Sequence, residues 1–153
     1  MLVIGVGNAL RRDDAAGLEI VRRMRARAEA SEIATYEHEG EALALLDIWE
    51  GAEAVVLVDA IRSGARPGTI HRVDATSTAI PVRLRGSSST HAVGVGEAIE
   101  LARALGRLPK TVLLFGVEGH RFEAGGRLSE EVEAMVGTLA DVVLREAIEL
   151  RGA

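Results

Sequence analysis

Hydrophobic positions along the chain alternate between short continuous runs and longer stretches with helical spacing. The short runs are typical of buried β-strands, and the longer stretches place apolar residues three or four positions apart, as on one face of a helix. This order predicts an α/β protein in which helices cover a mainly parallel sheet. The predicted strands are residues 2–6, 33–38, 54–60, 69–73 and 111–117, and the predicted helices are residues 13–27, 41–49, 90–105 and 129–150.

The clearest strand is the Val-rich run over residues 54–60, which has no polar alternation and therefore predicts burial on both faces of the sheet. A Pro67-Gly68 turn follows and leads into the next strand. Residues 62–68 are too few for a crossover helix, so we expect the strand over residues 69–73 to run antiparallel to its predecessor. No repeat or linker divides the chain, and we expect a single domain over residues 1–153.

Composition and charge exclude several classes of protein and of binding partner. The chain is 48% hydrophobic and 27% charged, which excludes extensive disorder. Its 18 Lys and Arg against 23 Asp and Glu leave a net charge of −5, so we expect no nucleic-acid partner and no membrane partner drawn by charge. With no cysteine, disulfides and thiol chemistry are excluded. Residues 2–6 are too short a run for a secretory signal, and no stretch reaches the roughly 20 apolar residues of a membrane helix, so the cytoplasm is the expected location.

Candidate functional residues follow the strands, because ligands in open α/β sheets bind beyond the carboxyl ends of the strands. Asp13 and Asp14 follow the first strand, and since one carboxylate suffices to cap the next helix, we assign one to structure and the other to function. Asp59 ends a buried strand, where an acid is unfavourable unless it is hydrogen-bonded, paired or metal-bound, although a turn cap is an alternative. His91 follows a serine-rich loop at a predicted helix start, where the helix dipole favours the neutral imidazole.

Asp14, Asp59 and His91 would form an O,O,N donor set, which suits a divalent first-row metal ion with open positions for water or substrate. The other histidines are interpreted as structural or solvent-exposed: His38, His71 and His120.

The glycines and serines suggest two further kinds of site. Gly5 and Gly7 either cradle a ligand or only permit a sharp turn; a dinucleotide motif would need a third glycine where Leu10 stands, and the following acids would repel phosphates. A serine hydrolase is disfavoured because no G-x-S-x-G elbow surrounds the serines at positions 87–89.

Several short motifs occur in a fixed order along nearly the whole chain. The pattern G-x-G-N-x-L-x-x-D-[DE]-x-x-G is met by Gly5, Gly7, Asn8, Leu10, Asp13, Asp14 and Gly17. It is followed by Val58-Asp59-Ala60, Pro67-Gly68-Thr69, Ser89-Thr90-His91, Gly116-Val117-Glu118, and Leu128-Ser129 with Val132-Glu133. In this ordered set the chain resembles the hydrogenase maturation endopeptidases, which process the large subunit of nickel-iron hydrogenases.

The resemblance implies a three-layer α/β/α sandwich with a mixed, mostly parallel five-stranded sheet that has one antiparallel strand. It implies that Asp14, Asp59 and His91 are the catalytic and metal-binding residues. The implied activity is a single cut that removes the C-terminal extension of the hydrogenase large-subunit precursor after nickel insertion. The implied cofactor is the nickel that the precursor itself carries, and other divalent ions are able to occupy the same ligands in vitro.

One segment departs from the family pattern. The family often has a G-G-T-x-G stretch after the second strand, whereas residues 37–42 read EHEGEA, which bears on the choice of precursor. Two other function classes stay open: a nucleotide-binding α/β protein, and a non-catalytic chaperone that only grips the large subunit.

Overall fold

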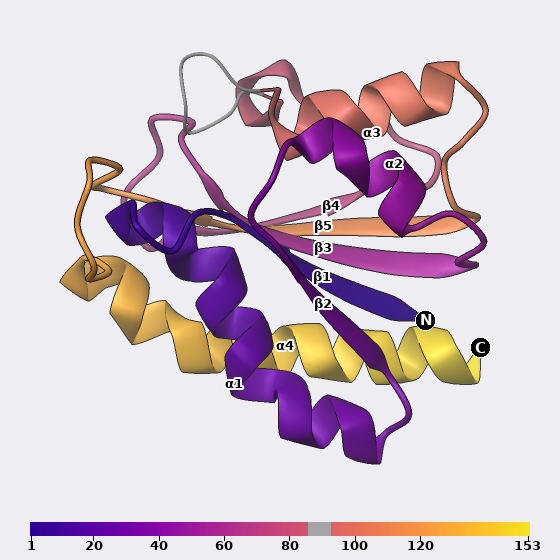
Figure 1. The fold of residues 1–153 in the computed structure, drawn as a ribbon, viewed down its shortest axis with the longest axis horizontal. Helices are drawn as coiled ribbons and strands as arrows, with labels where there is room; N and C mark the ends of the chain where they lie inside the picture. Colours follow the sequence, from indigo (N-terminus) through magenta and orange to yellow (C-terminus); the bar gives the residue numbers. More distant parts are fainter. Residues whose placement is uncertain (86–92) are drawn as a thin grey trace.

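The computed structural model describes residues 1–85 and 93–153, and it has one five-stranded sheet with helices on both faces (Figure 1). The strands are β1 (Leu2–Val6), β2 (Ala34–His38), β3 (Ala54–Ile61), β4 (Ile70–Asp74) and β5 (Thr111–Glu118). The α-helices are α1 (Ala16–Ala30), α2 (Leu45–Ile48), α3 (Val95–Ala104) and α4 (Glu130–Gly152). Three short 3-10 helices are η1 (Arg12–Ala15), η2 (Ala42–Ala44) and η3 (Val82–Leu84).

The strand order β2-β1-β3-β5-β4 confirms the predicted mixed sheet, with a single antiparallel pair. β4 runs antiparallel to β3, as its short connection predicted, but β5 lies between them and is its hydrogen-bonded neighbour. The connection crosses the end of β5, where the Gly68 N–H donates to the Glu118 carbonyl at 2.8 Å. Asp59, Gly116 and His71 therefore stand in one row across three strands.

Two hydrophobic layers enclose the sheet and make the α/β/α sandwich. α1 and α4 cover one face, and α2 and α3 cover the other (Figure 1). The first layer buries Met24 and Phe115, and the second buries Trp49, whose indole N–H donates to the Arg107 carbonyl at 3.1 Å. Side chains alternate along β3, so Val55 and its i+2 neighbours face α2 and α3.

The predicted helices differ from the observed ones mainly at their ends. The helix predicted over residues 13–27 starts as η1 and extends to residue 30, and the one predicted over 41–49 divides into η2 and α2. The helix predicted over residues 90–105 is α3, which begins after Gly94; residues 86–92 lie outside the described chain. η3 lies in a stretch for which the sequence predicts no helix.

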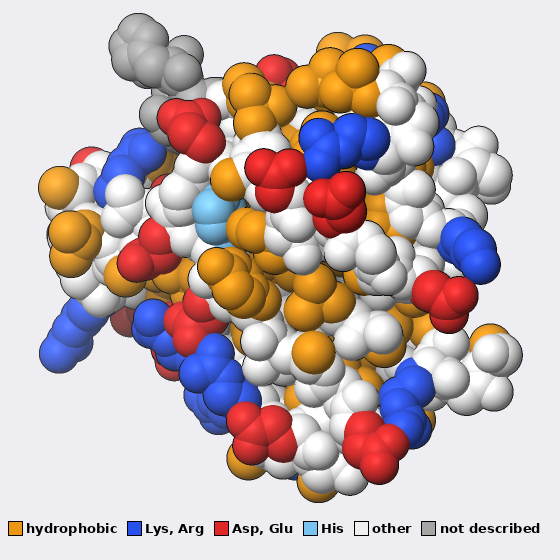
Figure 2. Space-filling model, turned by 45° about the vertical axis from the view of Figure 1, so that its right-hand side comes forward, with side chains coloured by type: hydrophobic (Ala, Val, Ile, Leu, Met, Phe, Trp, Pro, Cys, Tyr) orange, Lys and Arg blue, Asp and Glu red, His pale blue; other side chains and the backbone are white. Residues whose placement is uncertain are grey.

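No helix in the described part of the chain has the length and apolar character needed to cross a membrane. On the face drawn in Figure 2, acidic and basic side chains are interspersed rather than gathered by sign. This pattern accords with the modest net charge of −5.

Candidate active site

Asp14 reaches the carboxyl end of the sheet because the chain after β1 packs unusually close to the strands. A Cβ added at Gly17 would lie 2.4 Å from the Val6 carbonyl oxygen and 2.3 Å from the Val58 carbonyl oxygen. Only glycine permits so short a distance between α1 and the ends of two strands. This contact places η1, and with it the 9% exposed Asp14, beside the end of β3.

Asp14 and Asp59 line the same cleft, which has a volume of about 410 Å³. Asp59 shares the side-chain direction of Leu57 and Ile61, so its carboxyl group faces the α2 and α3 layer. The N-terminal end of α3 closes the cleft through Val95 and the residues before it. The structure therefore brings together two of the three predicted site residues at the edge where strand ends form ligand sites.

The electrostatics of Asp59 show that the two carboxyl groups interact. Burial raises the pKa of Asp59 well above its usual value, and the negative charge of Asp14 raises that pKa further. A hydrogen bond from the Ala60 backbone N–H opposes the shift. The alternative that Asp59 is only a turn cap is thereby weakened, because an ordinary cap is held ionised by its hydrogen bonds.

His91 lies outside the described residues, so its place in the site stays a prediction. Within residues 1–85 and 93–153, no group of three or more acidic or histidine side chains is arranged to hold a metal ion. Two carboxylates in one cleft fit the oxygen part of the predicted O,O,N set.

Asp13 is the structural member of the acidic pair. It is fully buried, and its Oδ2 accepts hydrogen bonds from the His120 N–H at 2.8 Å, the Arg121 N–H at 2.9 Å and the Ser129 hydroxyl at 2.8 Å. Its Oδ1 accepts from the Ser129 N–H at 2.7 Å. Burial acts to raise the pKa of Asp13, but these bonds outweigh burial and hold the pKa below its usual value.

Asp13 thus caps the start of α4 rather than the helix that follows it in sequence. The expectation that one acid is structural is supported, whereas the expectation that it caps its own helix is wrong. Asp13 contacts a helix so distant in sequence because the loop after β5 packs against η1. There the Asp13 N–H also donates to the Arg121 carbonyl at 2.9 Å.

The acidic segment after β2 forms one wall of the cleft. Glu39 and Glu41 line it together with Asp14 and Asp59, and Arg11 is the one lysine or arginine among the described residues that line it. The Glu39 Oε1 accepts a hydrogen bond from the Ala9 N–H at 2.9 Å. The segment that departs from the family pattern, residues 37–42, is therefore part of the cleft wall.

Glu118, which the sequence analysis names only within a motif, is a further buried acid at this end of the sheet. Glu118 is 1% exposed, and it accepts hydrogen bonds from the Ser63 N–H at 2.8 Å, from the Ser63 hydroxyl and from His71 Nε2 at 3.2 Å. Its position at the end of a buried strand is the same signal that identified Asp59. His71 is accordingly structural, as expected, and so is His38, whose Nε2 contacts the Glu41 carbonyl at 2.8 Å.

Comparisons with known proteins agree with the motif pattern. A family model described as hydrogenase maturation protease (HycI) matches residues 19–146. The chain is 30% identical to the hydrogenase 2 maturation protease of Escherichia coli K12 over 146 residues, which cover 94% of this chain and 88% of that protein. It is 29% identical to the hydrogenase expression/formation protein HupD of Thiocapsa roseopersicina, of whose length the match covers 66%. The structure of the E. coli hydrogenase maturating endopeptidase HybD superimposes with a TM-score of 0.75 at 28% identity, covering 97% of this chain and 91% of HybD.

Proposed function

The chain belongs to the hydrogenase maturation protease family, and on that premise we propose that it is an endopeptidase acting on a nickel-iron hydrogenase large-subunit precursor. The proposed reaction is a single cut that removes the precursor's C-terminal extension after nickel insertion. The nickel that the precursor carries is the feature by which the enzyme recognises a substrate ready for cleavage. The place of action proposed is the cytoplasm.

The observation that carries this proposal is the meeting of Asp14 and Asp59 in one cleft at the carboxyl end of the sheet. Two carboxylates that approach closely repel each other, and a bound cation relieves that repulsion. Carboxylate oxygens are suitable ligands for a divalent ion, and an imidazole from His91 would complete the set. The resulting ligands come from separate segments of the chain and leave coordination positions open for those supplied by the precursor.

In the proposed mechanism, Asp14 and Asp59 hold the precursor by the nickel ion that it delivers and so position its C-terminal extension in the cleft. Bound nickel supplies Lewis-acid chemistry, polarising a carbonyl group or a water molecule. Asp13 takes no proton in the reaction, because its oxygens already accept four hydrogen bonds and its pKa is lowered. The acidic residues Glu39 and Glu41 shape the wall that the extension contacts.

The acidic lining of the cleft disfavours the nucleotide-binding alternative. Asp14, Glu39 and Glu41 all border it, and their negative charge would repel a phosphate group. The chaperone alternative shares the same partner and differs only in the absence of a cut. An assay of precursor mass therefore separates the protease from both alternatives.

The test mixes the purified protein with nickel-loaded or nickel-free precursor and follows the mass of the large subunit. Asp14→Asn and Asp59→Asn each remove one of the two proposed carboxylate ligands, and Asp141→Asn, at an exposed acid on α4, is the matched control. We expect the wild type and the control to shorten only the nickel-loaded precursor, and both cleft variants to lose the cut.

Three results would count against parts of the proposal. Trimming of both precursor forms alike contradicts recognition through nickel. Wild-type rates in both cleft variants contradict the role of the two acids. Binding of the precursor by the wild type without any change of mass favours the chaperone.

A further inference from the structure

Leu10 is a solvent-exposed hydrophobic residue beside the cleft. Its side chain is 75% exposed, in a chain where large aliphatic residues are mostly buried. Single exposed leucines are common on protein surfaces and by themselves indicate nothing. Leu10 differs because the loop that carries it is tightly fixed by hydrogen bonds and lies between two hollows of the surface.

The loop is fixed because every backbone N–H from Gly7 to Asp14 donates a hydrogen bond. The acceptors, in chain order, are the His38 carbonyl, the Asp14 carbonyl, Glu39 Oε1, Asn8 Oδ1, the Asn8 carbonyl, and the carbonyls of Gly125, Arg121 and Arg11. The Leu10 carbonyl in turn accepts from the Gly125 N–H at 2.9 Å. A side chain presented on such a loop loses little backbone entropy when a partner binds it, which favours its use as an anchor.

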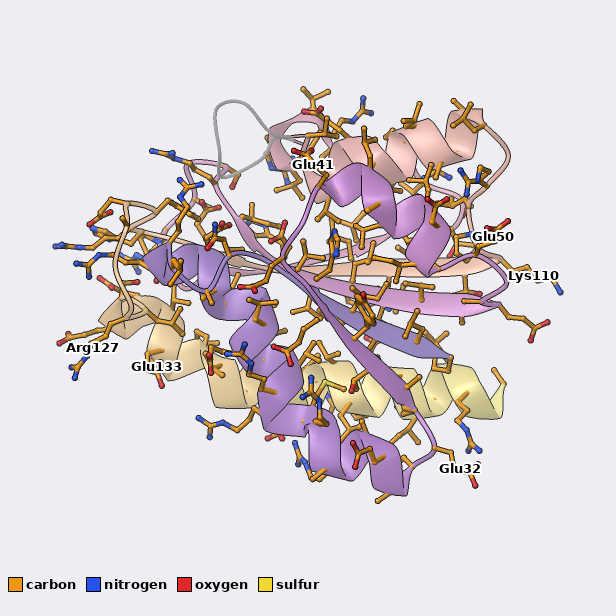
Figure 3. All side chains as sticks on the ribbon, in the orientation of Figure 1. Glu32, Glu41, Glu50, Lys110, Arg127 and Glu133 are labelled. Carbon is orange, nitrogen blue, oxygen red and sulfur yellow. The ribbon has the colours of Figure 1, made fainter. Side chains whose placement is uncertain are left out.

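Leu10 stands on the boundary between the cleft and a second hollow. Asn8 and Arg11 line the cleft, whereas Ala9 lines a groove of about 610 Å³ between the N-terminal parts of α1 and α4. In Figure 3, Arg127 and Glu133 lie near the start of α4, whereas Glu41 lies on the α2 side of the sheet. The loop thus separates a hollow on each side of the sheet.

The groove, named here the α1–α4 groove, combines an apolar lining with an acidic rim. Ala15, Leu128 and Ala134 contribute the apolar part. Its charged members are three glutamates, Glu19, Glu130 and Glu133, against one arginine, Arg127.

Two of these glutamates have no basic side chain among the described residues paired with them. Glu19 pairs with Arg22 at 2.8 Å, but Glu130 and Glu133 form no ion pair with any other residue in the described parts of the chain. An occupant that complements the groove therefore carries an apolar side chain next to a lysine or an arginine.

We propose that Leu10 and the α1–α4 groove dock the large-subunit precursor, through a surface segment with an apolar side chain beside a basic residue. This inference rests on the proposed function, since the precursor is the partner whose extension enters the adjoining cleft. The precursor would dock on one side of the loop and be cleaved on the other. The structure of the protein would thereby fix the distance between the docked segment and the peptide bond that is cut. Residues far from the reacting bond would then decide which precursor is processed.

The test compares Leu10→Ser with Val82→Ser, because Val82 is 79% exposed and lies outside both hollows. A second variant, Glu130→Lys with Glu133→Lys, is compared with Glu149→Lys on the same helix. Cleavage of nickel-loaded precursor is measured over a range of precursor concentrations, and precursor binding is measured separately by interferometry. Melting curves of the single variants should coincide with that of the wild type, since these changes are on the surface. The double lysine variant should melt at a lower temperature, because both lysines would stand in the first turn of α4 and oppose the helix dipole.

We expect Leu10→Ser to raise KM about tenfold, equivalent to about 1.4 kcal/mol, with kcat retained at saturating precursor. The double lysine variant should also raise KM, and added salt should reduce the difference from wild type. Equal KM values for Leu10→Ser and Val82→Ser would overturn the docking inference while leaving the protease assignment intact.

Absence of cleavage by the wild type would instead defeat the proposed function. Docking would then be judged by binding alone. It is supported if Leu10→Ser weakens precursor binding about tenfold relative to Val82→Ser, and overturned if both bind equally.

Discussion

The buried carboxylate of Asp13 joins three segments that are distant in sequence, and its replacement by asparagine tests how much this junction stabilises the fold. Oδ2 accepts hydrogen bonds from two backbone N–H groups and from the Ser129 hydroxyl, whereas Oδ1 accepts from the Ser129 N–H alone. An asparagine retains most of these bonds when its oxygen takes the place of Oδ2. Its NH2 group then faces the Ser129 N–H, and two donors oppose each other.

The cost of Asp13→Asn follows from this geometry. One hydrogen bond to a charged acceptor is lost, which costs about 1.5–3 kcal/mol. The other three bonds change from charge-assisted to neutral, and each weakens by roughly 0.5–1 kcal/mol. We therefore expect a loss of about 3–6 kcal/mol, a large share of the roughly 5–15 kcal/mol that stabilises a typical domain.

Urea denaturation followed by circular dichroism measures this loss. The midpoint should fall while the slope with urea stays unchanged, because the variant changes stability rather than the surface exposed on unfolding. Asp141→Asn is the control, since that acid is exposed in its ion pair with Arg27 and should contribute less than about 1 kcal/mol.

The stabilisation by Asp13 also depends on pH. The pKa of Asp13 is lower in the folded state than in the unfolded chain, so the folded state binds its proton less readily. The contribution is fully present above the unfolded pKa of about 3.9 and is lost as the pH falls through the lower folded value. Wild type and Asp13→Asn should therefore converge in stability below about pH 4.

Two outcomes would refute this reasoning. A midpoint for Asp13→Asn within error of that for Asp141→Asn would mean that the four hydrogen bonds contribute little. A difference between wild type and Asp13→Asn that stays constant down to low pH would mean that the charge of Asp13 is not what stabilises the junction.

Two further predictions concern stability. Asp59→Asn should raise the melting temperature of the metal-free protein by the equivalent of about 0.5–2 kcal/mol, because it removes a buried acid repelled by Asp14. Since the folded pKa of Asp59 is raised, this gain should grow as the pH rises above the unfolded value of about 3.9, and a gain that is constant with pH would contradict it. Gly17→Ala should destabilise by about 1–3 kcal/mol in urea, because its Cβ meets two strand carbonyls. Gly137→Ala, at an open helix position, should stabilise by up to about 1 kcal/mol, and equal effects of the two changes would contradict the close packing of α1.

Most strands could be predicted from local pattern alone. β3 and β5 are continuous apolar runs because both of their faces are buried, and such runs are visible without any tertiary information. The helix predicted over residues 41–49 was less accurate, since this stretch contains η2, which has three residues, and α2, which has four. A helix of that length is stabilised by the burial of its side chains rather than by its own propensity.

The candidate site was predictable to the extent that it depends on strand ends. Asp14 and Asp59 were both identified because parallel strands bring their carboxyl ends to one edge, and the structure places the two acids in one cleft there. The hydrogen-bond partners of Asp13 were not predictable, although the sequence already placed Asp14 rather than Asp13 in the donor set. Adjacent residues with the same side chain differ only in which neighbours the fold supplies.

By itself, the sequence determined the alternation of strands and helices, the direction of β4 and the residue types available to bind a cation. These features depend on local periodicity, on loop length and on composition. The tertiary structure alone decided that β5 separates β3 from β4, that Asp13 caps a helix begun 116 residues later at Ser129, and that Leu10 stands between two hollows. Those features arise from contacts between segments that are distant in sequence, and the free energy of such contacts depends on the packing of the whole chain.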